Sequence, residues 1–376
     1  MVESVFLKKP LVNRKKIIHT SLSQQRSVLL FHSGIKSEMT KKHYSYWLDL
    51  FLKHFMIKNH DNLLEIEPKK LQEMVEDYVM YEKSRNKSAS YIAGKICALK
   101  LFFSMNDVIL NWTKLQKMIP ERTKPAGDMA YSTKQIQTLL KHNSHPFYRA
   151  LIHFMSSSGA RVDAFQELKI GHLKDMPNGC KSVLVYAGTI HEYYTFIHKE
   201  TVESLNEYLD SRRKKGEIIT DDSWVFCSPR DSSVASKQHT ISSGISRYVE
   251  KTLGRIKVKE NRFEIMSCHG MRKRFATILK SNNAVNNNLA EKLMGHSVSI
   301  PLDNAYFKPV IEQLFNEYQK AIPQLIIDEK YRLQSQIQSQ HDEIGLLQDK
   351  NIEIENLQKT ILQIQNNMLE LQTRFS

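Results

Sequence analysis

Apolar side chains recur every three or four residues along most of this chain, which predicts helices. One helix is predicted from about Thr40, and others over 68–84 and 89–105. Downstream, helices are predicted over 133–142, 146–157, 200–214, 236–253, 268–281 and 286–294. Residues 181–188 and 192–198 alternate in polarity and are rich in β-branched and aromatic side chains, which predicts a β-hairpin. We therefore expect an α+β fold, mainly helical with one small sheet.

Changes in composition divide the chain of 376 residues into five segments. Residues 1–37 are basic, lack steady periodicity and are interpreted as a flexible arm. A helical domain is predicted over 38–119. Residues 120–132 contain two prolines and a glycine, the composition of a linker. A second domain, which contains the hairpin, is predicted over 133–322.

The last segment, residues 325–376, is predicted to form a coiled coil. Apolar residues step by four and three from Leu333 to Ile354, and the pattern resumes at Leu357 after an extra step of three. An alternative is an amphipathic helix that folds onto the body of the protein. The abundance of Gln, Asn and Glu leaves only a narrow apolar seam, which favours pairing with another helix, most simply that of another copy of the chain.

The formal net charge is +14, and it is distributed unevenly. Residues 1–60 carry eleven Lys and Arg against three Asp and Glu, whereas residues 325–376 carry five against eight. A basic body with an acidic tail indicates a polyanionic partner, with nucleic acid favoured over a membrane surface. A solvated basic surface without a partner is the alternative interpretation.

Two other patterns bear on where the protein works. The four cysteines are far apart and form no C-x-x-C pair, so neither a disulfide framework nor a zinc ribbon is indicated. The start of the chain lacks the apolar core of a signal peptide, and no stretch approaches the length of a membrane span. We expect a cytoplasmic protein associated with the nucleoid rather than with a membrane.

Five residues form a candidate catalytic set. The stretch SCHGMRKRF, residues 267–275, places His269 and Arg272 one helical turn apart, on a helix that Ser267 is predicted to cap. Arg161 follows a run of small residues, where it can approach a backbone phosphate, and a further helix is predicted to start beside it. His296 follows a short helix that stops at a glycine, and Tyr306 comes ten residues later.

These residue types are suited to phosphoryl transfer on a DNA backbone without a metal or another cofactor. Two guanidinium groups can donate hydrogen bonds to the charged oxygens of the transition state. A neutral histidine can donate to the same oxygens or take the phenolic proton, and the tyrosine is the nucleophile. Motifs of zinc peptidases, P-loop NTPases and serine hydrolases are absent from the sequence.

In this order and spacing, the residues resemble the tyrosine recombinases, or phage-type integrases, and most of all their archaeal members. The resemblance covers roughly residues 40–322. It implies a helical core-binding domain and a catalytic domain that clamp DNA. It also implies catalytic roles for the matching positions, which are Arg161, His269, Arg272, His296 and the nucleophile Tyr306.

The sequence departs from the family pattern at two positions. The carboxylate usually found three residues after the first arginine is replaced by Ala164, which Asp163 and Glu167 flank. The hairpin turn lacks the lysine that protonates the leaving group, and His191 or Lys181 is left as the candidate acid.

The resemblance implies a site-specific DNA recombinase that forms a 3′-phosphotyrosine intermediate and assembles as a tetramer on paired sites. Integration of a mobile element and a host resolution role both remain open. One alternative is a type IB topoisomerase, which shares this chemistry. The other is a catalytically weak DNA-binding or architectural protein on the same fold.

Overall fold

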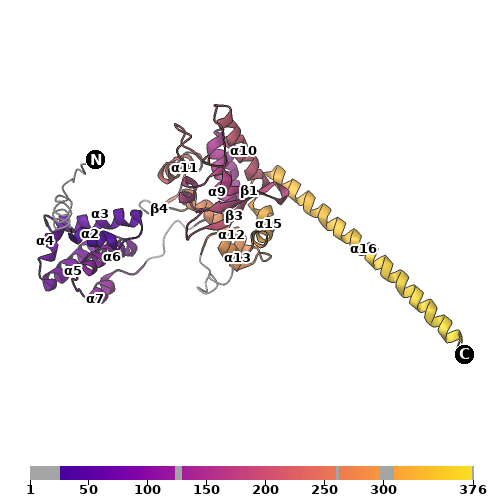
Figure 1. The fold of residues 1–376 in the computed structure, drawn as a ribbon, viewed down its shortest axis with the longest axis horizontal. Coiled ribbons are helices and arrows are strands. Elements are labelled where there is room, and N and C mark those ends of the chain that lie inside the picture. Colours follow the sequence, from indigo (N-terminus) through magenta and orange to yellow (C-terminus); the bar gives the residue numbers. More distant parts are fainter. Residues whose placement is uncertain (1–25, 123–128, 260–261, 297–308, 375–376) are drawn as a thin grey trace, which may run out of the picture. The chain divides into compact units, whose positions relative to one another are not determined.

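The computed structural model describes residues 26–122, 129–259, 262–296 and 309–374. The chain divides into two compact units, residues 1–125 and 126–376, whose elements Figure 1 labels. Each unit has its own hydrophobic core. The described residues are mostly helical and include a three-stranded antiparallel sheet. The predicted mainly helical α+β fold is therefore confirmed.

The first unit is helical throughout its described part. Its elements are α2 (Arg26–Ser33), α3 (Glu38–His54), α4 (His60–Leu64), α5 (Pro68–Ser84), α6 (Ala89–Met105) and α7 (Trp112–Met118). Helices α5 and α6 have the bounds that the apolar spacing predicts. At the start of α6, the Ser88 hydroxyl accepts a hydrogen bond from the Tyr91 N–H at 3.3 Å, and the predicted apolar face of the helix is buried.

Helix α2 corrects the interpretation of residues 1–37 as a flexible arm. Residues 26–33 form this helix, and the Phe31 side chain is completely buried against Phe102 of α6. Burial of the Phe31 ring stabilises α2, which is too short to show helical periodicity in the sequence. Residues 1–25 lie outside the described part of the chain.

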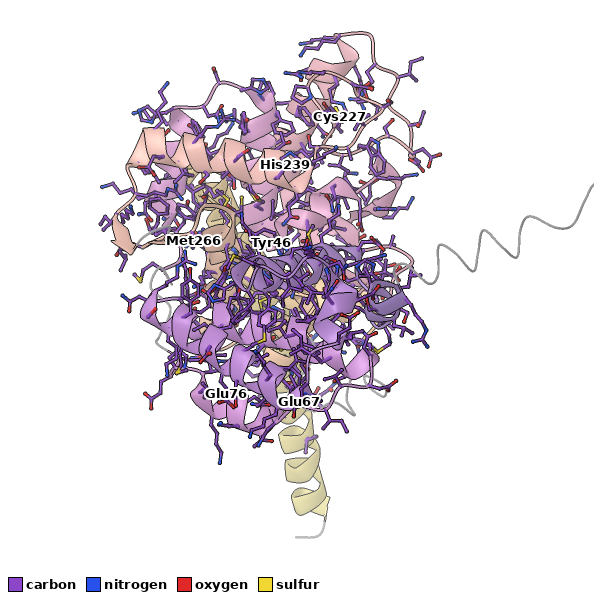
Figure 2. All side chains as sticks on the ribbon, turned by 90° about the vertical axis from the view of Figure 1, so that its left-hand side faces the viewer. Tyr46, Glu67, Glu76, Cys227, His239 and Met266 are labelled. Atoms are coloured by element: carbon purple, nitrogen blue, oxygen red, sulfur yellow. The ribbon has the colours of Figure 1, made fainter. Side chains whose placement is uncertain are left out.

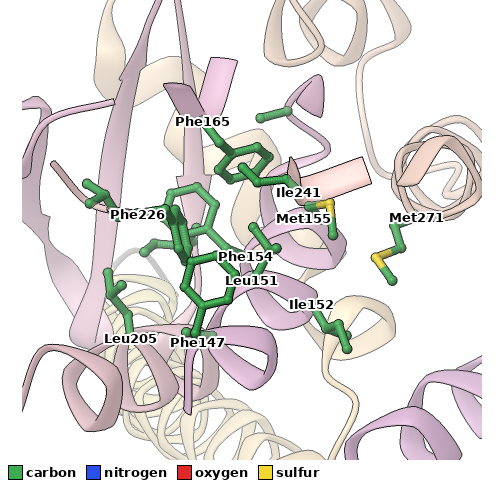
Figure 3. Close-up of a cluster of buried hydrophobic side chains, with 14 of the residues drawn as sticks. Phe147, Leu151, Ile152, Phe154, Met155, Phe165, Leu205, Phe226, Ile241 and Met271 are labelled. Atoms are coloured by element: carbon green, nitrogen blue, oxygen red, sulfur yellow. The ribbon is translucent and has the colours of Figure 1, made fainter. Parts of the chain in front are cut away.

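The second unit begins with the helices α8 (Thr133–Lys141) and α9 (Pro146–Ser158). Ser132 caps α8 in a capping box with Gln135. Every residue of α9 from Ala150 onward is buried, and the helix packs against α10 (Lys199–Arg213), α12 (Ser267–Ser281) and the sheet. Figure 3 shows side chains of α9 among aromatic rings that include Phe165 and Phe226.

The sheet contains one strand more than the predicted hairpin. Strands β2 (Cys180–Val185) and β3 (Tyr193–Ile197) form the hairpin, and β1 (Leu173–Met176) pairs with the free edge of β2. The β1 sequence, LKDM, has only four residues, and its two central residues are polar and exposed. So short a segment shows no recognisable strand periodicity. The prediction of two strands is therefore incomplete.

The remaining elements complete the second unit. They are η1 (Val162–Gln166), η2 (Ile170–His172), η3 (Pro177–Gly179), α11 (Gln238–Leu253), β4 (Lys257–Lys259), β5 (Arg262–Phe263), α13 (Asn287–Leu293), α15 (Ile311–Leu325) and α16 (Glu329–Arg374). The element beside Arg161 is η1, a short 3-10 helix, rather than a longer α-helix.

Two predicted boundaries need correction. Ser267 is the first residue of α12 and not its cap, because its hydroxyl is engaged by Ser246 and Arg255 of neighbouring segments. The predicted coiled coil began at residue 325, but Leu325, Ile326 and Ile327 are buried in the second unit. These apolar side chains join the core of the unit, so the exposed tail starts only with α16.

Candidate active site

The end of α9 positions the first predicted catalytic residue. Gly159 terminates the helix in the left-handed conformation, with φ of 60°. A Cβ atom at this position would lie 2.2 Å from the Phe275 ring of α12, so only glycine allows the helix end to pack this closely. The chain then turns, and Arg161 precedes η1 with its side chain partly exposed.

Arg272 of α12 is the most buried of the predicted site residues that the structure describes. Its side chain is 6% exposed. One guanidinium nitrogen donates to the Gly159 carbonyl at 2.5 Å, and the other donates to the Met294 carbonyl at 2.6 Å. Two backbone carbonyls from separate elements therefore fix the orientation of this charged group.

His296 lies against the same guanidinium group. Its Nε2 atom is 2.7 Å from the second guanidinium nitrogen of Arg272, and its Nδ1 atom is 2.7 Å from a carboxylate oxygen of Glu291. Arginine can only donate, so Nε2 of His296 accepts a hydrogen bond from Arg272. The ring proton is then on Nδ1, which donates a hydrogen bond to the Glu291 carboxylate. This pattern defines a neutral imidazole with one tautomer.

The electrostatic environment also favours the neutral form of His296. Burial lowers the pKa of this side chain, Glu291 opposes that effect, and the positive charges of Arg272 and Arg161 lower the pKa further. Glu291 in turn is paired with Lys280 of α12. The imidazole therefore stays neutral near physiological pH.

His269 occupies the more open side of the site. It lies one turn before Arg272 on α12, and its side chain is exposed. Partial burial lowers the pKa of His269, and the charges of Arg272 and Arg161 add to this effect. Because its side chain is exposed, His269 can reach a ligand that approaches from solvent. Figure 2 labels Met266, the residue directly before α12.

The four described members of the predicted set come together at one place. Arg161 acts electrostatically on His269, Arg272 and His296, although it lies more than a hundred residues from them in the sequence. The elements that meet here are the end of α9, the start of α12 and the turn after α13. Tyr306, the predicted nucleophile, lies outside the described residues.

Two residues of the site were not predicted from the sequence. One is Glu291, which orients His296. The other is Tyr193 of β3, whose ring packs against Gly295, where a Cβ atom would lie 2.4 Å from it. The buried Tyr193 hydroxyl lies near Arg272, although no hydrogen bond of ordinary geometry reaches it from the described residues. Burial raises the pKa of Tyr193, and the nearby arginines oppose this rise.

The carboxylate expected three residues after Arg161 has no direct replacement. Ala164 is buried in the core. Asp163 accepts a hydrogen bond from the Tyr186 hydroxyl at 2.8 Å, and Glu167 is exposed at the end of η1. Among the described residues, Glu291 is the carboxylate that contacts a predicted catalytic histidine.

The two candidate acids for the leaving group lie on the hairpin. Lys181 of β2 forms an ion pair with Asp175 on the neighbouring strand β1. Hydrogen bonding to this lysine lowers the pKa of the Asp175 carboxyl group. His191 is exposed in the turn between β2 and β3. This ion pair is partly exposed and is therefore weak.

Comparison with known proteins gives one family match. Residues 131–309 match the family model described as "Phage integrase family". This range includes all five predicted site residues. A search of curated proteins found no match. Along the described part of the chain, no helix is both long enough and apolar enough to cross a bilayer.

Solved structures with a similar fold include two integrases. The Tn1549 transposon integrase in complex with transposon right end DNA is 16% identical, with a TM-score of 0.53, and the match covers 78% of this chain and 98% of that one. A lambda integrase dimer bound to a COC′ core site is 15% identical, with a TM-score of 0.51, and the match covers 77% of this chain and 95% of that one. At such low identity, these similarities concern the fold.

Proposed function

This chain is a member of the phage integrase family over residues 131–309, and on that premise we propose that it is a site-specific DNA recombinase. It cuts and rejoins DNA strands through a covalent 3′-phosphotyrosine intermediate. The observation that carries this proposal is the fixed guanidinium of Arg272, held by two backbone carbonyls beside a neutral His296 and within the field of Arg161.

The proposed site stabilises negative charge that develops on a scissile phosphate. Arg272 is oriented before the substrate arrives, so little reorganisation is needed when the charge forms. Arg161 is less buried and can close on the second non-bridging oxygen. Because these groups supply the positive charge, the proposed reaction uses neither a metal ion nor a nucleotide.

The proposed covalent step uses Tyr306 as the nucleophile. Its phenolic oxygen attacks the phosphorus, a bond from phosphorus to this oxygen forms, and the bond to the 5′-oxygen breaks. The phenolic proton passes to a neutral histidine, and His191 or Lys181 donates a proton to the leaving 5′-oxygen. Attack by the 5′-hydroxyl of a partner strand reverses these steps and completes the exchange.

Double-stranded DNA is the proposed substrate, and the net charge of +14 supports this choice. The Tn1549 integrase named above was solved in complex with transposon right end DNA, and the lambda integrase dimer was solved bound to a COC′ core site. We further propose that the protein acts as a tetramer on two paired sites, within the cytoplasm and on the nucleoid.

The experiment begins with selection of bound sequences from a random DNA library. Two copies of the selected site are placed on one supercoiled plasmid and incubated with the full chain in the presence of a chelator. We expect a recombinant product and a protein–DNA adduct that survives denaturation. Relaxation without recombinants would identify a topoisomerase instead, and binding without an adduct would identify a non-catalytic DNA-binding protein.

A further inference from the structure

Helix α16 carries an apolar seam that the rest of its own chain leaves uncovered. From Leu333 to Ile364, the described large apolar side chains on this seam are 50% to 65% exposed. The helix has 46 residues and therefore extends for roughly 70 Å. An exposed apolar stripe of this length in water requires a partner.

The residues along the seam match the pattern of a two-stranded coiled coil. In the heptad notation, Ile337, Ile344 and Asn351 occupy a positions. Leu333, Gln340, Leu347 and Ile354 occupy d positions. In a parallel assembly, β-branched residues at a with leucine at d favour two strands, and one asparagine at an a position fixes the register and the number of strands.

We propose that α16 pairs with α16 of a second copy as a parallel, in-register, two-stranded coiled coil. This assembly goes beyond the proposed recombinase chemistry and does not depend on it. In this arrangement, Asn351 faces the Asn351 of the second copy, so each buried amide has a hydrogen-bonding partner.

Charge complementarity supports the parallel arrangement. Lys350 occupies a g position and Glu355 the following e position, and both side chains are exposed. In a parallel in-register pair, a g residue faces the next e residue of the partner helix, so Lys350 of one copy meets Glu355 of the other on both sides of the seam. An antiparallel pair satisfies the amide of Asn351 only in the register that places Asn351 opposite Gln340, the polar d residue of the seam.

The base of α16 is fixed to the second unit of its own chain. The two carboxylate oxygens of Glu200 accept hydrogen bonds from the N–H groups of Ile327 and Asp328, at 3.0 and 2.8 Å. Arg274 donates to the carbonyls of Gln324 and Leu325 at 2.9 and 3.2 Å. Because this anchor is intramolecular, a parallel coil brings two catalytic units together at the same end of the coil.

Other occupants of the seam are less suitable. Residues 325–376 carry five basic against eight acidic side chains, which disfavours contact with DNA. Folding of the helix back onto its own unit is disfavoured because, from Arg332 to Ile364, the described side chains are exposed, with only Gly345 intermediate. A second copy supplies an identical seam with matching length, register and charges.

The test uses leucine-to-cysteine variants of the full chain in a Cys97→Ser background, because Cys97 is the exposed native thiol among the described cysteines. Leu333→Cys, Leu347→Cys and Leu357→Cys place a thiol on the seam. Leu362→Cys is the matched control. After the extra step of three at Leu357, the pattern places Leu357 at a d position and Ile361 at an a position, so Leu362 follows at b and faces away from the seam. Under mild oxidation, we expect all three seam variants to form disulfide-linked dimers and the control to remain mostly unlinked.

The pattern of linkage identifies the arrangement. An antiparallel pair would bring at most one of the three positions opposite its own copy, so linkage at a single position would overturn the parallel assignment. Equal linkage of all four variants would reflect random collision and would overturn the proposal.

Sedimentation equilibrium without DNA provides a second measurement that needs no cysteine. We expect a mass of two chains for the wild type and for Leu362→Glu, and loss of the dimer for Leu347→Glu. A monomeric wild type, or a mass of three or four chains, would also overturn the proposal. Since DNA is absent, failure here leaves the proposed recombinase activity unaffected.

Discussion

At the residue scale, the proton positions in the site follow from Arg272. A guanidinium group has only donors, so each group that it contacts must accept. Its contacts are the carbonyls of Gly159 and Met294 and the Nε2 atom of His296. The ring proton of His296 is therefore on Nδ1, which donates a hydrogen bond to the Glu291 carboxylate. Glu291 supplies this orientation from a different position than the carboxylate that Ala164 replaces.

This arrangement makes a prediction for Glu291→Gln. Loss of the carboxylate charge removes an interaction that raises the pKa of His296, so that pKa should fall further below its ordinary value. The neutral imidazole should then persist to lower pH, and the acid limb of the cleavage rate should move to lower pH. The maximal rate should fall by roughly tenfold to a hundredfold, the range found for carboxylates that orient metal-binding histidines.

The cleavage rate of this variant is measured as a function of pH on a single-site substrate. Glu207→Gln, which changes an exposed carboxylate on α10, is the control and should leave the profile unchanged. An acid limb that moves to higher pH would mean that Glu291 does not act through His296.

The two arginines should respond differently to removal. Arg161→Ala should lower the cleavage rate by about a hundredfold or more, the usual effect of losing one preorganised donor to a transition state. Its fold stability should change little, because the side chain is partly exposed. Arg272→Ala should lower cleavage at least as much and should also destabilise the unit, because two buried carbonyls lose their donor.

Cleavage and thermal unfolding are compared for both variants and for Arg213→Ala, an exposed arginine on α10. The affinity of both variants for DNA should stay close to that of the wild type, since many other basic residues contribute to binding. Normal cleavage by both variants would show that this grouping of residues is not the active site.

At the element scale, the site depends on how closely α9 approaches α12. Gly159→Ala should destabilise the second unit through two effects. The left-handed backbone costs about 1–2 kcal/mol for a non-glycine residue. The new methyl group meets the Phe275 ring, which adds about 1–3 kcal/mol of overpacking. Movement of the Gly159 carbonyl should also weaken its contact with Arg272 and slow cleavage.

Gly216→Ala separates these two effects. Gly216 also has a positive φ, of 90°, but an added Cβ atom would meet nothing within 4 Å. Denaturant unfolding of this variant should show only the backbone cost, with cleavage unchanged. Equal losses of stability for the two variants would show that the approach of the helices is not what requires glycine at position 159.

The sequence predicts elements well where one face of a long segment is buried. Helices α5 and α6 follow directly from their apolar spacing, whereas α2 and β1 are short and depend on contacts with distant segments. The pairing of Glu291 with His296 could not be predicted either. Its five-residue spacing does not match neighbours on a helix, and the contact forms because the chain reverses at Gly295, with φ of 61°.

Of the residues around Arg272, some could be predicted from the sequence and others could not. Their identities stand out as motifs, because His269 and Arg272 are one turn apart and Arg161 follows a glycine-ended helix. Tyr193 carries no such signal, since one tyrosine in a strand is more often a packing residue. Tyr193 lies beside Arg272 because β3 packs against α13, and this tertiary contact cannot be predicted from the sequence of either segment alone.

At the scale of the whole molecule, the boundary between body and tail lies later than the sequence predicts. Removal of residues 336–376 retains the buried Ile327 and the contact of Tyr331 with Glu203. This truncation should leave DNA binding and single-site cleavage largely unchanged, but weaken self-association and the pairing of two sites. Removal from residue 325 onward should also destabilise the second unit, because it deletes part of the core.

Light scattering, thermal unfolding and a two-site gel assay compare the two truncations with the full chain. Pairing of sites by the 336–376 deletion at the full wild-type level would indicate that the tail serves another function. Equal thermal stability of the two truncations would contradict the assignment of residues 325–327 to the core.

The bond that joins the protein to DNA can be identified by mass spectrometry of the trapped adduct. The protein is incubated with its selected site, denatured and digested with protease and nuclease, and the peptide that retains a nucleotide is sequenced. We expect a phosphate ester on Tyr306 in the wild type, and no adduct for Tyr306→Phe despite nearly normal DNA binding. A nucleotide attached to another residue, Tyr193 included, or an adduct that survives in Tyr306→Phe, would contradict it.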